Sequence, residues 1–327
     1  MREADETIVV TCPAVAVRSV VCSSCGGPIQ ASRFARSALC KFCGVTVFID
    51  PNAVERARFR DAFASWQDPA AQGFGGEPSV RVGGRTWALR QYIGHGDGSD
   101  VHAGTLARRP TERVVVKLAR GGDVGRYERE SARLAELQRS TAAGAAHFAT
   151  RVPQVVVRGV VDGGTDHGRA ALILRWTSGF LDTLADVRLA YPQGIDPRAS
   201  VWMWRRILET LAFAHRSGVA HGGLTPARLL VHPREHGIML VGWSGATTAS
   251  ASACAADLAA SARAIEGALE GSATPAALAE VLAQTAALRG IAGNPDADAW
   301  ALRDRVGEIA TACFGPPHFV TFTMPRW

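Results

Sequence analysis

Two closely spaced pairs of cysteines near the N-terminus constrain the fold of this chain more than any other feature. Residues 22–43 read CSSCGGPIQASRFARSALCKFC, so Cys22 and Cys25 form one C-x2-C pair and Cys40 and Cys43 form another. A glycine follows each pair, and glycine tolerates the positive φ that a tight metal knuckle needs. Four thiolates can supply the tetrahedral shell that Zn²⁺ prefers. The spacing therefore predicts one zinc ion.

The alternative interpretation is a pair of independent redox motifs, but these need a thioredoxin-like βαβ context that the sequence lacks. The flanking segments VRSVVC and CGVTVFID are typical of ribbon strands, so residues 1–50 are predicted to form a zinc ribbon. A shell of four cysteines leaves no open coordination position, which predicts a structural metal. A domain this small cannot bury enough apolar surface to fold without it.

What the ribbon contacts stays open, because zinc ribbons serve both nucleic-acid and protein binding. Arg33, Arg36 and Lys41 give only a thin basic face, with Phe34 and Phe42 nearby. The chain carries a formal charge of +6, but its basic residues are spread out and form no tract. Contact with a protein is the preferred interpretation, with nucleic acid as the alternative.

The next segment predicts a connection between two domains. Residues 54–66 place aromatic side chains at helical spacing, and residues 67–78 (QDPAAQGFGGEP) have the composition of a linker. We therefore expect a helix and linker over residues 51–79. No apolar run approaches the length of a membrane helix, and the N-terminus lacks the pattern of a secretory signal. These features predict a cytoplasmic protein without membrane contact.

Beyond residue 80 the order of elements predicts an α+β fold. Strand-like runs (RTWALRQYIG, SDVHAGTL, RVVVKLAR) precede a helical pattern over residues 125–139, and QVVVRGVV and RAALILRW add two strands. Residues 201–217 then predict a long helix. A strand-rich half followed by a helical half differs from the alternating βαβ pattern of parallel sheets.

Four segments in this region resemble protein kinases, in kinase order and at kinase-like distances. IGHGDGSDVHAG resembles the glycine-rich loop, VVVK the third-strand lysine motif, AHRSGVAHGGLTPARLLV the catalytic loop, and MLVGWSG the segment that normally contains DFG. The resemblance implies a bilobal protein-kinase-like fold. Residues 80–177 would form the N-lobe, and residues 178–327 a shortened C-lobe.

The resemblance also implies a nucleotide site. Gly94 and Gly96 would let the backbone approach phosphates, and Ser99 stands where a third glycine is usual. Lys117 matches the lysine that holds phosphates, and Glu130 is its expected partner because it shares a helix face with the apolar residues that follow. The local alternatives are an ordinary hairpin turn and a surface lysine.

Transfer chemistry in this fold needs a carboxylate base and oxygen ligands for Mg²⁺, and neither is evident. Gly223 stands at the base position, Thr225 replaces the usual lysine, Arg228 replaces the metal-binding asparagine, and Gly242 replaces the metal-binding aspartate. Between residues 218 and 256 the only acid is Glu235, so shifting the alignment recovers neither function. No Mg²⁺ is expected.

Two further features of this region shape the interpretation. The segment 244–256 is too short for a peptide-docking platform, and a helix is expected to begin at Asp257. His221 is interpreted as a packed core residue, whereas His232 and His236 are expected on an exposed turn. Arg228 allows the interpretation that it neutralises phosphates without Mg²⁺. The alternative is a plugged nucleotide pocket, with Trp243 or Arg228 folded inward.

These features predict a catalytically inactive pseudokinase that regulates or scaffolds bacterial signalling through protein partners, with weak Mg²⁺-independent nucleotide binding left open. The bacterial setting follows only from the Ala/Gly/Arg-rich composition and the family resemblance. One alternative is an atypical ATP-dependent Ser/Thr phosphotransferase or nucleotidyltransferase that draws its acids from elsewhere. The other is a nucleic-acid binder that works through the ribbon.

Overall fold

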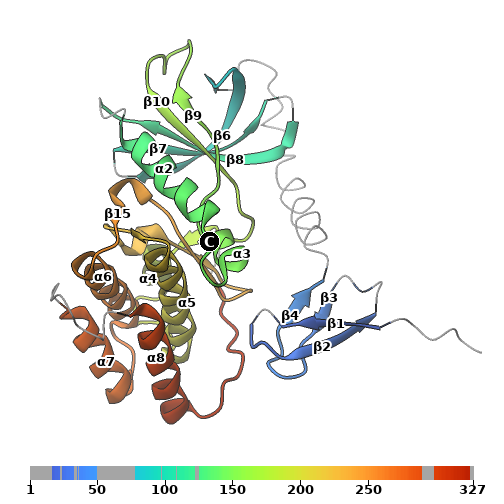
Figure 1. Cartoon of the computed structure of the whole chain (residues 1–327), viewed down its shortest axis with the longest axis vertical. Helices are drawn as coiled ribbons and strands as arrows, with labels where there is room; N and C mark the ends of the chain where they lie inside the picture. Colours follow the sequence, from blue (N-terminus) through green and yellow to red (C-terminus); the bar gives the residue numbers. More distant parts are fainter. Residues whose placement is uncertain are drawn as a thin grey trace, which may run out of the picture. The chain divides into compact units, whose positions relative to one another are not determined.

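The computed structural model divides into two compact units, Met1–Gln67 and Asp68–Trp327 (Figure 1). It describes residues 17–22, 24–32, 35, 37–49, 78–96, 98–107, 109–121, 125–288 and 298–324. The helix expected over residues 54–66 and most of the expected linker lie outside these residues, as do Arg33, Phe34 and Arg36.

The smaller unit consists of two short antiparallel hairpins, and each hairpin carries one cysteine pair. β1 (Val17–Val21) pairs with β2 (Pro28–Ser32), and β3 (Ser37–Leu39) pairs with β4 (Thr46–Phe48). The buried core among the described residues is small and includes two of the cysteines; its members are Cys22, Ile29, Cys40 and Val47. This arrangement matches the predicted ribbon.

The larger unit begins with a curled six-stranded antiparallel sheet in the order β5-β6-β7-β8-β10-β9. Its curvature encloses an apolar cluster centred on the buried Trp87, which explains the alternating burial along β5 and β8. Helix α2 covers the side of the sheet that faces the helices below (Figure 1). The bounds are β5 Ser79–Val82, β6 Arg85–Gly96, β7 Ser99–Leu106, β8 Arg109–Ala119, α2 Gly125–Arg139, β9 Val155–Val160 and β10 Ala170–Arg175.

The remainder is mostly helical and surrounds α5, whose central turns are buried almost all round. Short strands and 3₁₀ turns fill the chain between α5 and α6, and one of these turns, η4, packs against α2. The bounds are α3 Ala145–Phe148, η2 Ala149–Arg151, β11 Asp182–Thr183, α4 Leu184–Ala190, α5 Pro197–Arg216, β12 Val219–Ala220, η3 Pro226–Arg228, β13 Leu229–His232, β14 Gly237–Leu240, η4 Trp243–Gly245, β15 Thr247–Thr248, α6 Ala251–Leu269, α7 Ala276–Ala286 and α8 Ala299–Phe314.

Two helix starts differ from those predicted. α5 begins at Pro197, four residues before the expected start, because Asp196 caps it and proline suits the first helical position. α6 begins at Ala251 rather than Asp257, because the Ser250 side chain accepts a hydrogen bond from the Ala253 amide. None of the described helices combines the length and apolar content needed to cross a bilayer.

Candidate functional site

The four cysteines predicted to bind metal come together in the smaller unit. Their sulfur atoms all lie within 4.8 Å of one another, and the Sγ atoms of Cys22 and Cys43 are 3.6 Å apart. The two knuckles repeat one geometry: the Gly26 amide donates to the Cys22 carbonyl, and the Gly44 amide donates to the Cys40 carbonyl. Both glycines have positive φ, 75° and 71°, as the spacing predicts. This cluster could hold a metal ion.

Without a cation the thiols of this cluster differ in acidity: burial opposes ionisation of Cys40, but hydrogen bonds from the Phe42 and Cys43 backbone outweigh it and lower its pKa to about 7. Burial, followed by hydrogen bonds with the other three cysteines, raises the pKa of Cys43 to about 12. A dication between the sulfurs would reverse this effect, because ligation requires thiolates. The donor set therefore fits a soft or borderline metal held by sulfur alone.

In the larger unit, Lys117 and Glu130 form the predicted ion pair. The Lys117 ammonium lies 2.8 and 2.6 Å from the two Glu130 carboxylate oxygens, and the Glu130 side chain is fully buried. Glu128, the other glutamate available, is two-thirds exposed and pairs with Arg158 on the surface. The pair joins β8 to α2 and leaves the lysine close to the glycine-rich segment.

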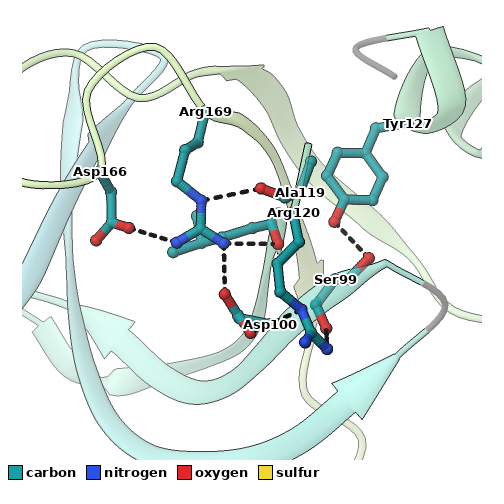
Figure 2. Close-up of polar contacts among 8 residues, drawn as sticks. Ser99, Asp100, Ala119, Arg120, Tyr127, Asp166 and Arg169 are labelled. Atoms are coloured by element: carbon teal, nitrogen blue, oxygen red, sulfur yellow. Dashed lines mark hydrogen bonds and ion pairs between the residues drawn. The ribbon is translucent and has the colours of Figure 1, made fainter. Parts of the chain in front are cut away.

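Gly94 and Gly96 lie near the end of β6, and Gly96 pairs with Ser99 at the start of β7. A Cβ at Gly94 would meet no atom within 4 Å, so the backbone there is open to close approach. Ser99 differs, because its side chain is buried and accepts a hydrogen bond of 2.7 Å from the Tyr127 hydroxyl (Figure 2). Its hydroxyl thus anchors the hairpin to α2 and faces away from any ligand over the loop.

An ion-pair network fixes the same hairpin next to its tip, where Asp100 pairs with His95 in the sheet. Arg169 pairs with both Asp100 and Asp166 and donates to the Ala119 carbonyl, while Arg120 also pairs with Asp100 (Figure 2). These residues come from β7, from β8 and its end, and from the turn before β10. The returning strand of the glycine-rich segment is therefore held on both faces of the sheet.

In the segment that resembles a kinase catalytic loop, the Arg228 side chain lies across Gly223 and Gly242. Its guanidinium donates to the Gly223 carbonyl, and a Cβ at Gly223 would collide with the same guanidinium. A Cβ at Gly242 would come within 3.0 Å of the Arg228 Cδ. Burial lowers the pKa of Arg228, but arginine remains a cation in proteins. Thr225 is exposed beside this group.

Trp243 and His221 pack together beneath this loop. Trp243 is fully buried, donates its indole N–H to the Leu240 carbonyl, and lies 4.5 Å from the His221 ring, centroid to centroid. His221 is also fully buried, with Nε2 3.1 Å from the Val241 carbonyl, as expected for a core residue. Of the two residues proposed as a plug, Trp243 belongs to the core and Arg228 covers the loop.

Asp257 holds the loop in place, a role that the sequence did not reveal. Its buried carboxylate accepts hydrogen bonds from the backbone amides of His221 and Gly222, at 2.7 and 2.9 Å, and contacts the His215 ring at 3.0 Å. Thirty-five residues or more separate Asp257 from both amides, so only the packing of α6 against α5 and β12 brings them together.

This contact predicts a specific pH dependence of stability. Burial lowers the pKa of His215, but hydrogen bonds with Asp257 and Cys254 outweigh that effect and raise it to about 9, from 6.5. Because the folded state binds this proton more tightly, the stabilisation is complete below pH 6.5 and disappears as pH rises through 9. Its full size is roughly 3 kcal/mol. Urea unfolding of the wild type and His215→Gln should differ most near pH 6 and converge above pH 9; a constant difference would contradict this.

The expectation that His232 and His236 lie on an exposed turn is wrong. Their exposed fractions are 2% and 7%, because the β13–β14 hairpin packs its turn against α5 and the C-terminal segment. His232 packs edge-on against Phe180, and His236 is sandwiched between Trp202 and Phe319. Aromatic partners distant in sequence bury both rings.

No family model and no curated protein sequence matches this chain. Solved structures do. Vaccinia related kinase 3 aligns over 78% of this chain and 96% of its own, with a TM-score of 0.51 and 12% identity. The BubR1 kinase domain aligns over 80% and 93%, with a TM-score of 0.53 and 11% identity. At these identities the likeness concerns the fold alone: the chain has the fold of a protein kinase domain, preceded by a four-cysteine cluster.

Proposed function

We propose that this chain is a catalytically inactive kinase-fold protein, a pseudokinase, that regulates or scaffolds a signalling complex. The observation that carries the proposal is the position of Arg228. Phosphoryl transfer in this fold needs carboxylates at the positions of Gly223 and Gly242. The Arg228 side chain lies against the point where the first side-chain carbon of a residue at either position would stand.

The charge at this site supports the same proposal. A guanidinium beside the two glycines repels Mg²⁺ and offers donors where the metal needs oxygen acceptors. Between residues 218 and 256 the only acid is Glu235, which lies on the β13–β14 turn and contacts the His232 ring. No carboxylate in this stretch is available as a base.

The segment between Gly242 and the start of α6 is also too short to dock a peptide substrate. η4 ends at Gly245, β15 pairs with β12, and α6 already begins at Ala251. Because the first turn of α6 uses residues expected to form a loop, the segment is shorter than its sequence indicated. A protein with this surface would act on partners by binding them.

We further propose that the metal of the smaller unit is one structural zinc ion held by Cys22, Cys25, Cys40 and Cys43. Four cysteine sulfurs are the donor set of structural zinc sites, and the matching knuckle hydrogen bonds suit a closed tetrahedral shell. The exposed Phe42, with the Lys41 ammonium 5.1 Å from its ring, gives this unit a surface suited to a protein partner. Bacterial signalling remains the proposed setting.

The affinity for ATP, measured with and without Mg²⁺, tests whether the site can hold this metal. ATP should bind the full chain weakly or not at all, and Mg²⁺ should leave the affinity unchanged, because Arg228 stands where the metal would be held. Calorimetric titrations with and without Mg²⁺ measure this, in buffers without chelator so that the cysteine cluster is undisturbed. Lys117→Met should abolish whatever binding occurs, whereas the exposed control Arg139→Gln should not. Tighter binding with Mg²⁺ in the wild type would overturn the proposal.

A further inference from the structure

A small cavity of about 130 Å³ lies in the helical part of the larger unit, away from the loop that contains Arg228. It is bounded by the first half of α5, the last turns of α8 and the segment 315–320. Its polar lining comes from Arg198, Trp202, Arg205, His236, Thr311 and His318, and no acidic residue lines it. The cavity is therefore cationic.

Arg205 is the unusual member of this lining. Its Nε atom is buried and has no hydrogen-bond partner within the part of the chain that the structure describes. The two nearby carboxylates already form ion pairs with other arginines. Glu209 pairs with Arg206 and Arg303, and Asp304 pairs with Arg303. Burial and the neighbouring Arg303 lower the pKa of Arg205. The local charge of three arginines is thus matched by only two acids.

A second buried donor lines the same cavity. The Trp202 indole N–H has no acceptor among the described residues, and the ring is held by stacking 4.2 Å from His236. Phe319 stacks on the other face of His236, so the C-terminal segment closes this side. Burial lowers the pKa of His236 to about 4, so its ring is neutral at pH 7. Both N–H groups are closed off from the cavity by the packing around them, so a ligand there would be held by the charge of the arginines, which favours an anion.

We propose that this cavity binds a small phosphate-class oxyanion. Arg205 would supply a positive charge at the cavity wall, and the exposed Arg198 would supply a second cation at the rim, where its guanidinium lies 5.8 Å from the Phe314 ring. Ligand pockets for drug-sized molecules span about 300–1,000 Å³, so this cavity suits one phosphoryl group and excludes a nucleotide. The site does not depend on the inactivity proposed for the loop that contains Arg228.

Inorganic phosphate is the first probe. Thermal shift and calorimetry on the full chain should show stabilisation by phosphate over chloride at equal ionic strength. Arg205→Gln should weaken phosphate binding about tenfold or more, because the positive charge at the cavity wall is lost. Arg139→Gln, which removes an exposed arginine at the end of α2, should leave binding unchanged. Should Arg205→Gln fail to fold, Arg198→Gln at the exposed rim tests the same site and should also weaken binding.

Phosphoserine in a short peptide separates the two sources of such a group. Tighter binding of the phosphopeptide than of inorganic phosphate, with no binding of its unphosphorylated form, would assign the site to a phosphorylated partner. Equal or weaker binding would assign it to free phosphate. The proposal would be overturned if phosphate stabilised the protein no more than chloride does. It would also be overturned if phosphate stabilised the wild type and the folded Arg205 or Arg198 variant equally.

Discussion

Removing metal from the four-cysteine cluster is expected to unfold residues 17–49 and leave the larger unit folded. The buried core of this unit contains Cys22, Ile29, Cys40 and Val47, too little apolar surface to fold without help. A structural zinc of this kind supplies about 10–16 kcal/mol of apparent binding free energy at neutral pH. Cys40→Ser should therefore abolish the ordered structure of both hairpins.

Hydrogen exchange followed by mass spectrometry measures this directly, with metal content determined on the same samples. The wild type should contain one zinc per chain and protect the hairpin amides, whereas Cys40→Ser and chelator-treated protein should lose both. Cys254→Ser provides the control, since this cysteine lies on α6, outside the cluster. Hairpins that stay protected after the metal is removed would contradict the account.

Asp257→Ala is expected to destabilise the larger unit by about 3–5 kcal/mol, the range seen when one partner of a buried charged pair is removed. The substitution removes the hydrogen-bond acceptor of the His221 and Gly222 backbone amides and the carboxylate that contacts the His215 ring. A loss of this size is a large fraction of the stability of most domains.

Urea denaturation, monitored by tryptophan fluorescence, provides the measurement because Trp243 and Trp204 are buried in this unit. Asp162→Ala is the matched control: this aspartate is 72% exposed and its ion pair with Arg81 spans 3.8 Å, so the change should cost less than about 1 kcal/mol. A loss for Asp257→Ala as small as that of the control would show that other contacts hold the loop.

Local patterns in the sequence predicted the parts of the fold that depend on neighbouring residues. The bounds of α2 follow from its helical periodicity, and the choice of Glu130 over Glu128 follows from the helix face that Leu134 and Leu137 share. The two outer ribbon strands, β1 and β4, likewise follow from their residue pattern, and the positive φ of the knuckle glycines follows from the cysteine spacing. In each case the deciding residues lie within a few turns or one hairpin.

Contacts between distant segments could not be predicted in this way. Asp257 meets the loop only because α6 packs beside it, and His236 is buried only because Phe319 returns from the C-terminal segment. The charge imbalance around Arg205 requires α5 and α8 to lie together. For Arg228 the sequence left two interpretations open, and it did not predict that the side chain would lie against both Gly223 and Gly242. The start of α5 is instead a local feature, since the pair Asp196–Pro197 is typical of a helix N-terminus.

The central claim, loss of transfer chemistry, is tested most directly by incorporation of label from ATP. The purified full chain is incubated with γ-labelled or α-labelled ATP and Mg²⁺ or Mn²⁺, with a general protein substrate, beside Lys117→Met. We expect the wild type to incorporate no more of either label than Lys117→Met. Incorporation of the γ-label that depends on Lys117 would identify a phosphotransferase, and incorporation of the α-label a nucleotidyltransferase; either result would contradict the account.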